Sequence, residues 1–311
     1  MPETLSPAPI SLRERPGRIL RSVNRWAAWR AGFSPRARGF TSQPDPRSIG
    51  SDTRGRQLMS GNLLFAGVLM QLPEDLPWAI APPSDAFEDE LHGFEWLDHL
   101  AAIADGSGRP MAQDWLADWL KRYGSGKGPG WSPDLVGRRQ IRWISHALFL
   151  MSGQSTAETR AFFAALGRQT AFLARRWRAT SHGLPRFEAL TGLIYSACAL
   201  TGMEHHLPAA LRALASECAH EIDASGGIVT RNPEELLNVF TLLTWAAAVL
   251  QESGKKPDPA VNTAIMRIAR GGWIRRCRNR ACAPRSSRGW RWDTRASLPG
   301  APPSWSMRAP R

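Results

Sequence analysis

Apolar side chains recur every three or four residues through most of the segment from residue 58 to residue 270, and they almost never alternate with polar ones. This period places apolar side chains along one face of an α-helix, whereas a half-buried β-strand needs a period of two. Hairpin signals such as Asn-Gly between β-branched runs are also absent from this segment. The pattern therefore predicts an all-α fold.

Capping signals divide this segment into successive helices. Ser155 is followed by Glu158, and Asn232 is followed by Pro233 and Glu235; both patterns are typical of a helix N-terminus. The loops are mostly short, so consecutive helices are expected to pack antiparallel as hairpins, in a solenoid or in an α/α toroid. The expected helices cover residues 84–104, 110–123, 133–151, 155–179, 187–202, 207–222, 232–250 and 257–270.

The chain has 311 residues and a formal net charge of +13, which is unevenly distributed. Residues 1–56 carry 11 Lys and Arg against 4 Asp and Glu, and residues 272–311 carry 10 against 1, so the segment between them is slightly acidic. A nucleic-acid-binding domain is expected to place its basic residues on the folded unit. We therefore expect a helical domain over residues 57–270 that binds no nucleic acid, preceded by a basic Arg- and Pro-rich arm over residues 1–56.

The last segment, residues 271–311, combines ten arginines, four tryptophans and five prolines with no apolar periodicity. This composition is typical of a GC-rich gene translated in the wrong frame. We interpret the segment as a disordered, out-of-frame tail that follows a frameshift near Arg270 and truncates the protein. The alternative is a genuine basic tail that binds RNA or acidic lipid.

Two observations bear on location. No apolar h-region follows the N-terminal arginines, and the uncharged runs 189–203 and 236–251 are shorter than a bilayer-spanning helix. The sequence therefore predicts a cytoplasmic protein without a transmembrane segment.

Three stretches of the chain resemble bacterial heparinase II/III family proteins. The resemblance covers residues 57–270 and implies an incomplete (α/α) toroid of antiparallel helix hairpins. In complete family members a β-sandwich domain follows the toroid, and its absence here agrees with the frameshift interpretation. The resemblance also makes the periplasm a second expected location. The three stretches are Glu90-Leu91-His92-Gly93-Phe94-Glu95-Trp96-Leu97, Gly130-Trp131-Ser132-Pro133 followed by Gly137-Arg138-Arg139 and Trp143, and residues 222–233.

Family members cleave uronate-containing polysaccharides by β-elimination. This reaction needs one group that neutralises the uronate carboxylate and a base that removes the C5 proton. In the family, an Asn-His pair opens the helix that corresponds to residues 187–202, and a tyrosine follows the turn that corresponds to residues 222–233. This chain has Leu184 and Pro185 at the first place and Glu235 near the second.

The two tyrosines, Tyr123 and Tyr195, match neither place. The candidate catalytic residues are therefore the carboxylates Glu188 and Glu235. The candidate substrate-binding residues share cationic, amide or aromatic side chains that suit an acidic sugar, and they are Arg186, Arg231, Asn232, Trp131 and Arg139.

Each assignment has an alternative. Arginine binds a carboxylate with two parallel hydrogen bonds, which favours Arg186 and Arg231 as substrate ligands, but Arg231 would equally tie its own turn. Asn232 and Glu235 fit a helix cap. Arg139 belongs to a group with Arg138 and Arg142 that also suits a structural ion-pair cluster.

Trp131 lies in a Gly- and Pro-rich loop, so it is the tryptophan most expected to be exposed and to stack on a sugar ring. His92, Glu95 and His99 share one helical face, a spacing that also suits a metal, but a solvated or partly buried face explains it as well. We expect no metal and no cofactor.

Two functions follow. The first is a heparinase II/III-like polysaccharide lyase that acts on an acidic polysaccharide or oligosaccharide and is impaired in this chain. The second is a non-catalytic toroid that binds a glycan or takes part in envelope assembly.

Overall fold

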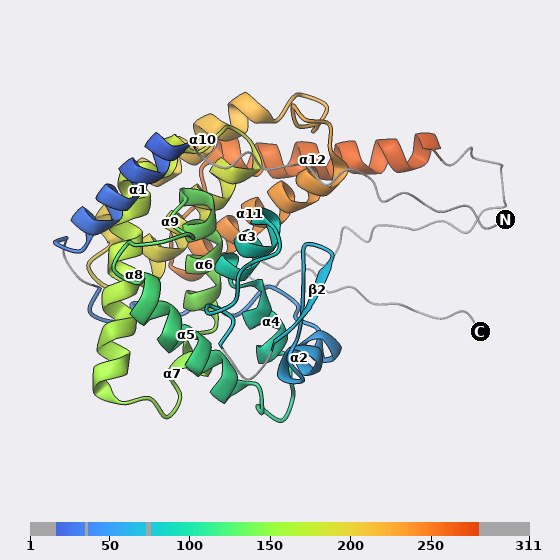
Figure 1. The fold of residues 1–311 in the computed structure, drawn as a ribbon. Coiled ribbons are helices and arrows are strands. Elements are labelled where there is room, and N and C mark those ends of the chain that lie inside the picture. Colours follow the sequence, from blue (N-terminus) through green and yellow to red (C-terminus); the bar gives the residue numbers. More distant parts are fainter. Residues whose placement is uncertain (1–16, 35–36, 73–75, 280–311) are drawn as a thin grey trace, which may run out of the picture. The chain divides into compact units, whose positions relative to one another are not determined.

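A computed structural model describes residues 17–34, 37–72 and 76–279 (Figure 1). The chain divides into two units, residues 1–272 and 273–311, and the fold below is that of the first unit. The frameshift and the disordered tail proposed from the sequence fall mainly on residues 280–311, outside the described residues. The helices are α1 (Arg18–Ala31), α2 (Asp52–Met59), α3 (Asp85–Gly93), α4 (Glu95–Ala101), α5 (Arg109–Tyr123), α6 (Pro133–Ser145), α7 (Ala147–Met151), α8 (Thr156–Arg176), α9 (Leu184–Ala199), α10 (Leu207–Glu221), α11 (Pro233–Glu252) and α12 (Pro259–Asn279), and the strands are β1 (Asn62–Phe65) and β2 (Val68–Gln71).

The all-α prediction is confirmed, and the chain forms an incomplete toroid of antiparallel helix hairpins. The helix starts read from capping signals are present. The Ser155 hydroxyl accepts a hydrogen bond from the Glu158 amide, and the Glu158 carboxylate accepts one from the Ser155 amide, which completes the capping box. The Asn232 side chain accepts a hydrogen bond from the Glu234 amide.

Two expected helices are each divided in two. The helix expected over residues 84–104 breaks at Phe94, whose φ of 62° lies in the left-handed region. The Phe94 ring is fully buried and stacks on Trp78, so tertiary packing outweighs local helix preference there. The helix expected over residues 133–151 ends at His146, whose imidazole Nε2 lies 2.8 Å from Asp98 Oδ1.

One short β-hairpin interrupts the helices. Strands β1 and β2 pair antiparallel, with Phe65 opposite Val68. The two turn residues between them, Ala66 and Gly67, have positive φ angles of 49° and 75°, which suit the tight turn of a two-residue hairpin. The hairpin forms without the usual Asn-Gly signal, because Ala66 takes the place of asparagine in the turn, so the sequence pattern did not indicate it.

The segment expected to be an arm contains helical structure. Helix α1 packs against α8, and the Arg176 side chain donates a hydrogen bond to Asn24 on α1. Helix α2 packs against α4 so closely that a Cβ at Gly55 would lie 2.4 Å from the carbonyl oxygen of His99.

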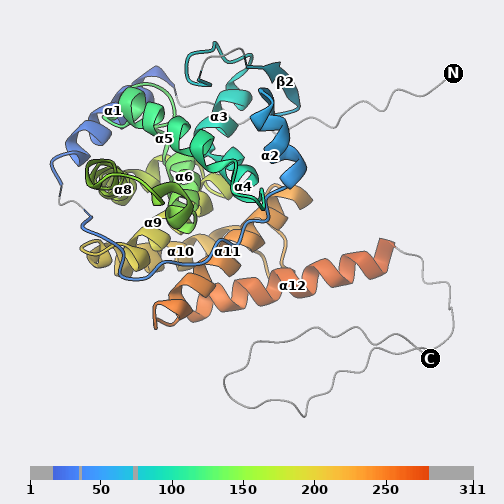
Figure 2. The ribbon, with the colours of Figure 1, turned by 90° about the horizontal axis from the view of Figure 1, so that it is seen from below.

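Helix α9 forms the centre of the fold (Figure 2). It packs against α6, α8, α10 and α11, and every residue from Phe187 to Ala199 is buried. The crossing of α6 and α9 depends on two glycines. A Cβ at Gly192 would lie 2.5 Å from the Cα of Gly137, and a Cβ at Gly137 would lie 2.2 Å from the carbonyl oxygen of Glu188. These two backbones are therefore in direct contact.

This contact gives a first prediction. Gly137→Ala should lower the free energy of unfolding by about 1–3 kcal/mol, because the added methyl group pushes α6 away from α9. The direction of this change is informative, because a glycine-to-alanine substitution inside a helix otherwise stabilises the protein by up to about 1 kcal/mol. Thermal unfolding followed by circular dichroism measures it. Gly39→Ala, where a Cβ meets nothing within 4 Å, is the control. An unchanged or raised melting temperature for Gly137→Ala would contradict the close crossing.

Candidate functional site

The first candidate catalytic carboxylate, Glu188, lies inside the protein. It is 6% exposed on α9, and Arg138 Nε of α6 lies 3.6 Å from its Oε1 atom. A carboxylate in this place balances the charge of a neighbouring arginine at the helix crossing. It does not face solvent, where a polysaccharide would have to approach.

The second candidate, Glu235, takes part in the start of α11. Its carboxylate accepts a hydrogen bond of 2.7 Å from the Thr230 hydroxyl and one of 3.4 Å from the Asn232 amide. Asn232 is itself the N-cap of the helix. The capping interpretation of both residues therefore accounts for their contacts.

Arg231 ties the preceding turn. Its φ of 55° is left-handed, and its Nη1 atom lies 2.7 Å from Asp223 Oδ2. Hydrogen bonds from the Ser225 hydroxyl and the Gly227 amide, together with Arg231, hold the pKa of Asp223 well below its usual range. The guanidinium of Arg231 is 61% exposed but already has a carboxylate partner.

Trp131 and Arg139 are both buried, at 3% and 0% exposure. The expectation that Trp131 is exposed is wrong, because its indole nitrogen donates to the carbonyl oxygen of Tyr123 and its ring packs edge-on against Phe172. Arg139 donates to Gln169 and to backbone carbonyl oxygens, so neither side chain can contact a sugar from solvent in this arrangement.

A buried aromatic cluster surrounds Arg139. Its guanidinium carbon lies 4.2 Å from the ring centre of Trp119 and 5.9 Å from that of Trp143, distances typical of cation–π contacts. Burial lowers the pKa of Arg139 to about 9, so its side chain still carries its charge at neutral pH. The cluster is part of the core.

The two histidines of the helical face considered as a metal site, His92 and His99, have separate hydrogen-bond partners. The Trp119 indole nitrogen donates to His92 Nδ1 at 3.0 Å inside the aromatic cluster. His99 Nδ1 instead accepts the backbone N–H of Ser51. His92 and His99 therefore serve different local contacts.

Neither tyrosine is arranged as a catalytic base. The Tyr195 hydroxyl accepts a hydrogen bond from Arg47, and burial raises its pKa to about 12. Tyr123 lies against the rings of Trp78 and His92, and burial raises its pKa as well.

Arg186 belongs to a group of ionisable residues where α9 begins and α10 ends. Its Nη1 atom lies 3.6 Å from Glu217 Oε2, and its Nη2 atom donates 2.5 Å to the carbonyl oxygen of Thr180. His182 precedes α9, and its Nδ1 atom lies 3.0 Å from Glu217 Oε2. Arg186 and Arg231 are thus held by different carboxylates, Glu217 and Asp223, and no contact joins them in the described residues.

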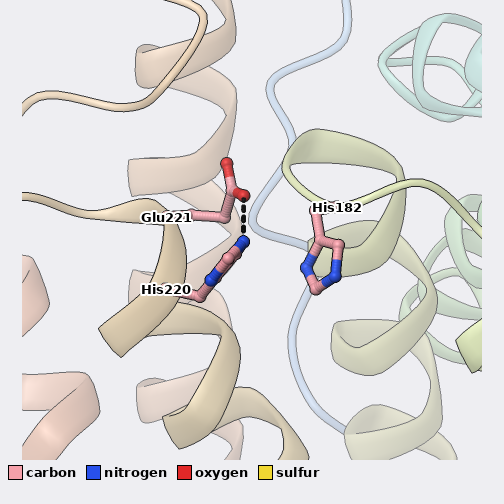
Figure 3. Close-up of side chains that lie close together, drawn as sticks. All are labelled: His182, His220 and Glu221. Atoms are coloured by element: carbon pink, nitrogen blue, oxygen red, sulfur yellow. Dashed lines mark ion pairs between the residues drawn. The ribbon is translucent and has the colours of Figure 1, made fainter.

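The same place holds three side chains whose possible ligand atoms lie within 4.8 Å of one another, which we call the His182–His220 cluster: His182, His220 and Glu221 (Figure 3). The two histidines are 52% and 60% exposed, and their ring centres are 4.4 Å apart. The Glu221 carboxylate is 6% exposed and pairs with His220 at 3.6 Å.

Sequence reasoning did not single out this cluster. One signal was available: Glu217, His220 and Glu221 recur at i, i+3 and i+4, which places them on one face of a helix. The other member of the cluster, His182, precedes α9, and only the fold brings it close to the end of α10.

Comparisons with known proteins bear on the fold and on kinship. No family model matches the chain. It is 33% identical over 243 residues to FtsZ-localized protein C of Caulobacter vibrioides, an alignment that covers 76% of this chain and 41% of that protein.

Solved structures show the same architecture. The heparan sulfate lyase HepC from Pedobacter heparinus superposes with a TM-score of 0.56 and 14% identity, over 80% of this chain and 43% of that one. A heparinase III structure gives a TM-score of 0.56 with 16% identity, over 72% of this chain and 41% of that one. The chain therefore has the helical toroid fold seen in these heparinases, and it spans less than half the length of each protein that it matches.

Proposed function

We propose that this chain is a non-catalytic envelope-assembly toroid that docks through α1 on the anionic cytoplasmic surface of a membrane. In this proposal the segment 1–56, expected from the sequence to be a basic arm, supplies the docking helix. The toroid behind it is a rigid scaffold for further partners.

The observation that carries the proposal is the outer face of α1. Three aromatic side chains on or next to this helix are largely exposed: Trp26 and Trp29 at 56% each, and Phe33 at 76%. Ile19, at 82%, lies one helix turn from the exposed Val23. The spacing of three or four residues places Ile19, Val23, Trp26 and Trp29 along one face of the helix, and an exposed apolar face of this kind marks an interaction site.

Charge favours a membrane as the occupant of this surface. Arg21, Arg25 and Arg30 are exposed on the same helix, and the guanidinium of Arg30 lies 4.9 Å from the ring centre of Trp26. Tryptophan and arginine side by side on one helix are typical of helices that lie in the headgroup region of anionic bilayers.

One comparison supports this proposal. The relative is named for localization with FtsZ, which suits a role in assembly rather than in catalysis. As a separate finding, no helix in the described part of the chain has the length and apolar character needed to cross a bilayer.

The contacts of three candidate residues support a non-catalytic role. Glu188, Glu235 and Tyr195 all have structural partners, so none of them is arranged to remove a proton from a sugar. An aligned base is a requirement of β-elimination.

Sedimentation with lipid vesicles tests the proposal. The full chain should co-sediment with vesicles that contain phosphatidylglycerol, and less with pure phosphatidylcholine or at high salt, because ionic strength screens the attraction. The double variant Trp26→Glu, Trp29→Glu should bind at least about tenfold more weakly, since each indole that enters the interface contributes on the order of 1–2 kcal/mol.

Leu237→Glu is the matched control, because Leu237 is 63% exposed on α11, away from α1. Equal binding by the double variant and this control would refute docking through α1.

A second candidate function is cleavage or binding of an acidic glycan. It is favoured by His182, which is exposed and lies 2.8–2.9 Å from Arg186 Nη1, so that a base and a cation are adjacent. Incubation with glycosaminoglycans and alginate, followed by the ultraviolet absorbance of unsaturated uronates, tests it. Product formed by the native chain and lost in His182→Ala would favour this second function.

A further inference from the structure

The His182–His220 cluster has the donor set of a transition-metal site. Two imidazoles and one carboxylate offer ligand atoms that all lie within 4.8 Å of one another. Zn²⁺ is commonly bound by histidine nitrogen together with a carboxylate oxygen, and two histidines with one glutamate leave a fourth position for water.

A carboxylate behind His182 provides an independent observation. Glu217 is 4% exposed, its Oε2 atom lies 3.0 Å from His182 Nδ1, and its Oε1 atom accepts the backbone N–H of Gly183 at 2.9 Å. Histidines that bind metals usually place their other ring nitrogen against a carboxylate, which fixes the tautomer and the direction of the free nitrogen. Glu217 is therefore placed as such a partner, which makes His182 Nε2, 2.8 Å from Arg186 Nη1, the candidate ligand atom.

The local charge also favours a cation. Glu217 and Glu221 are buried carboxylates in the last turn of α10, where the helix dipole is negative. Arg186 pairs with Glu217 at 3.6 Å. The carboxylate of Glu221 therefore remains for a cation held by the two histidines.

We propose that His182, His220 and Glu221 bind a divalent transition-metal ion, with water as the fourth ligand. The site is independent of membrane docking through α1 and adds to it a metal centre between α9 and α10.

The structure also defines what must move. Ligand atoms around tetrahedral zinc are about 3.3 Å apart, so the imidazoles must approach each other and Glu221. Both histidines are more than half exposed, whereas Glu221 is buried, so the imidazoles are the groups that must shift. Arg186 Nη1, within 2.9 Å of both His182 nitrogens, must move toward Glu217, with which it is already paired.

Calorimetric titration of the full chain with ZnCl₂ tests the proposal. One Zn²⁺ should bind per chain, and the double variant His182→Ala, His220→Ala should weaken binding at least tenfold, because two of three ligands are lost. Glu221→Gln should also weaken binding, since it removes the ligand charge while keeping the side-chain volume. His205→Ala, at an exposed histidine in the turn before α10, is the matched control and should bind as the native chain does.

A second measurement identifies the type of ligand atom. Co²⁺ in a tetrahedral site of nitrogen and oxygen ligands absorbs strongly in the visible range, and a cysteine ligand would add sulfur charge-transfer bands. The native chain should give the former without the latter. Equal Zn²⁺ binding by the native chain and by a folded double variant would overturn the proposal, and so would cysteine bands in the Co²⁺ spectrum.

Discussion

Arg139→Ala should lower the free energy of unfolding by about 3–5 kcal/mol, one of the two largest effects expected in this protein. The guanidinium donates hydrogen bonds to Gln169 Oε1 and to the carbonyl oxygens of His92 and Gly130, at 2.7–3.1 Å. These three acceptors lie in the core. Truncation leaves them without a donor and opens a cavity beside Trp119, so hydrogen-bond loss and packing loss act together.

Thermal unfolding is the measurement, because about 3–5 kcal/mol corresponds to a decrease of roughly 10 °C in melting temperature for a domain of this size. Arg139→Lys is the informative companion. It keeps the positive charge but has a single nitrogen, so it cannot reach all the acceptors and should recover only part of the loss. Arg122→Ala, which removes an exposed i,i+4 ion pair with Asp118, should change stability by less than about 0.5 kcal/mol. A loss at Arg139 as small as that at Arg122 would contradict the structural role of the buried guanidinium.

The fold could be predicted where local signals act alone. Helix starts at Ser155 and Asn232 follow from side chains that bond to nearby backbone amides, so a few consecutive residues determine them. The break at Phe94 could not be predicted in this way, because its left-handed backbone is stabilised by contacts with Trp78 and Trp143, which lie far away in the sequence.

The site was harder to predict than the fold for the same reason. Trp131 was expected to be exposed because glycine and proline surround it, yet the fold covers its ring with Phe172 of α8. His182 and the pair His220 and Glu221 belong to different helix ends, and no local pattern indicates that they meet. The heparinase resemblance predicted the toroid, but Glu188 and Glu235, the candidates chosen near the family's catalytic positions, already have structural partners.

Asp98→Asn should give the second large effect. Asp98 is 4% exposed, and its carboxylate accepts hydrogen bonds from Arg142 Nε at 2.9 Å and from the Ser48 hydroxyl at 2.7 Å. His146 Nε2 contacts the same carboxylate at 2.8 Å. Removing the negative charge leaves Arg142 in the interior with Glu95, 3.9 Å away, as its remaining carboxylate partner, a change that typically costs about 3–5 kcal/mol.

The cost of Asp98→Asn should depend on pH in a defined direction. Burial alone would raise the pKa of Asp98, but Arg142, His146 and Ser48 together hold it well below its usual range. A carboxyl whose pKa is lower in the folded state stabilises the protein above its unfolded pKa of about 3.9 and loses that contribution as the pH falls below this value. Chemical unfolding at several pH values, from neutral to strongly acidic, measures the free energy of unfolding of the native chain and of Asp98→Asn. The difference between the two free energies should be constant above about pH 5 and should shrink below about pH 4.

Asp52→Asn, in an exposed pair with Arg56, serves as the control and should cost less than about 1 kcal/mol at neutral pH. A difference between native chain and Asp98→Asn that stays constant down to strongly acidic pH would show that the charge of Asp98 does not stabilise the fold.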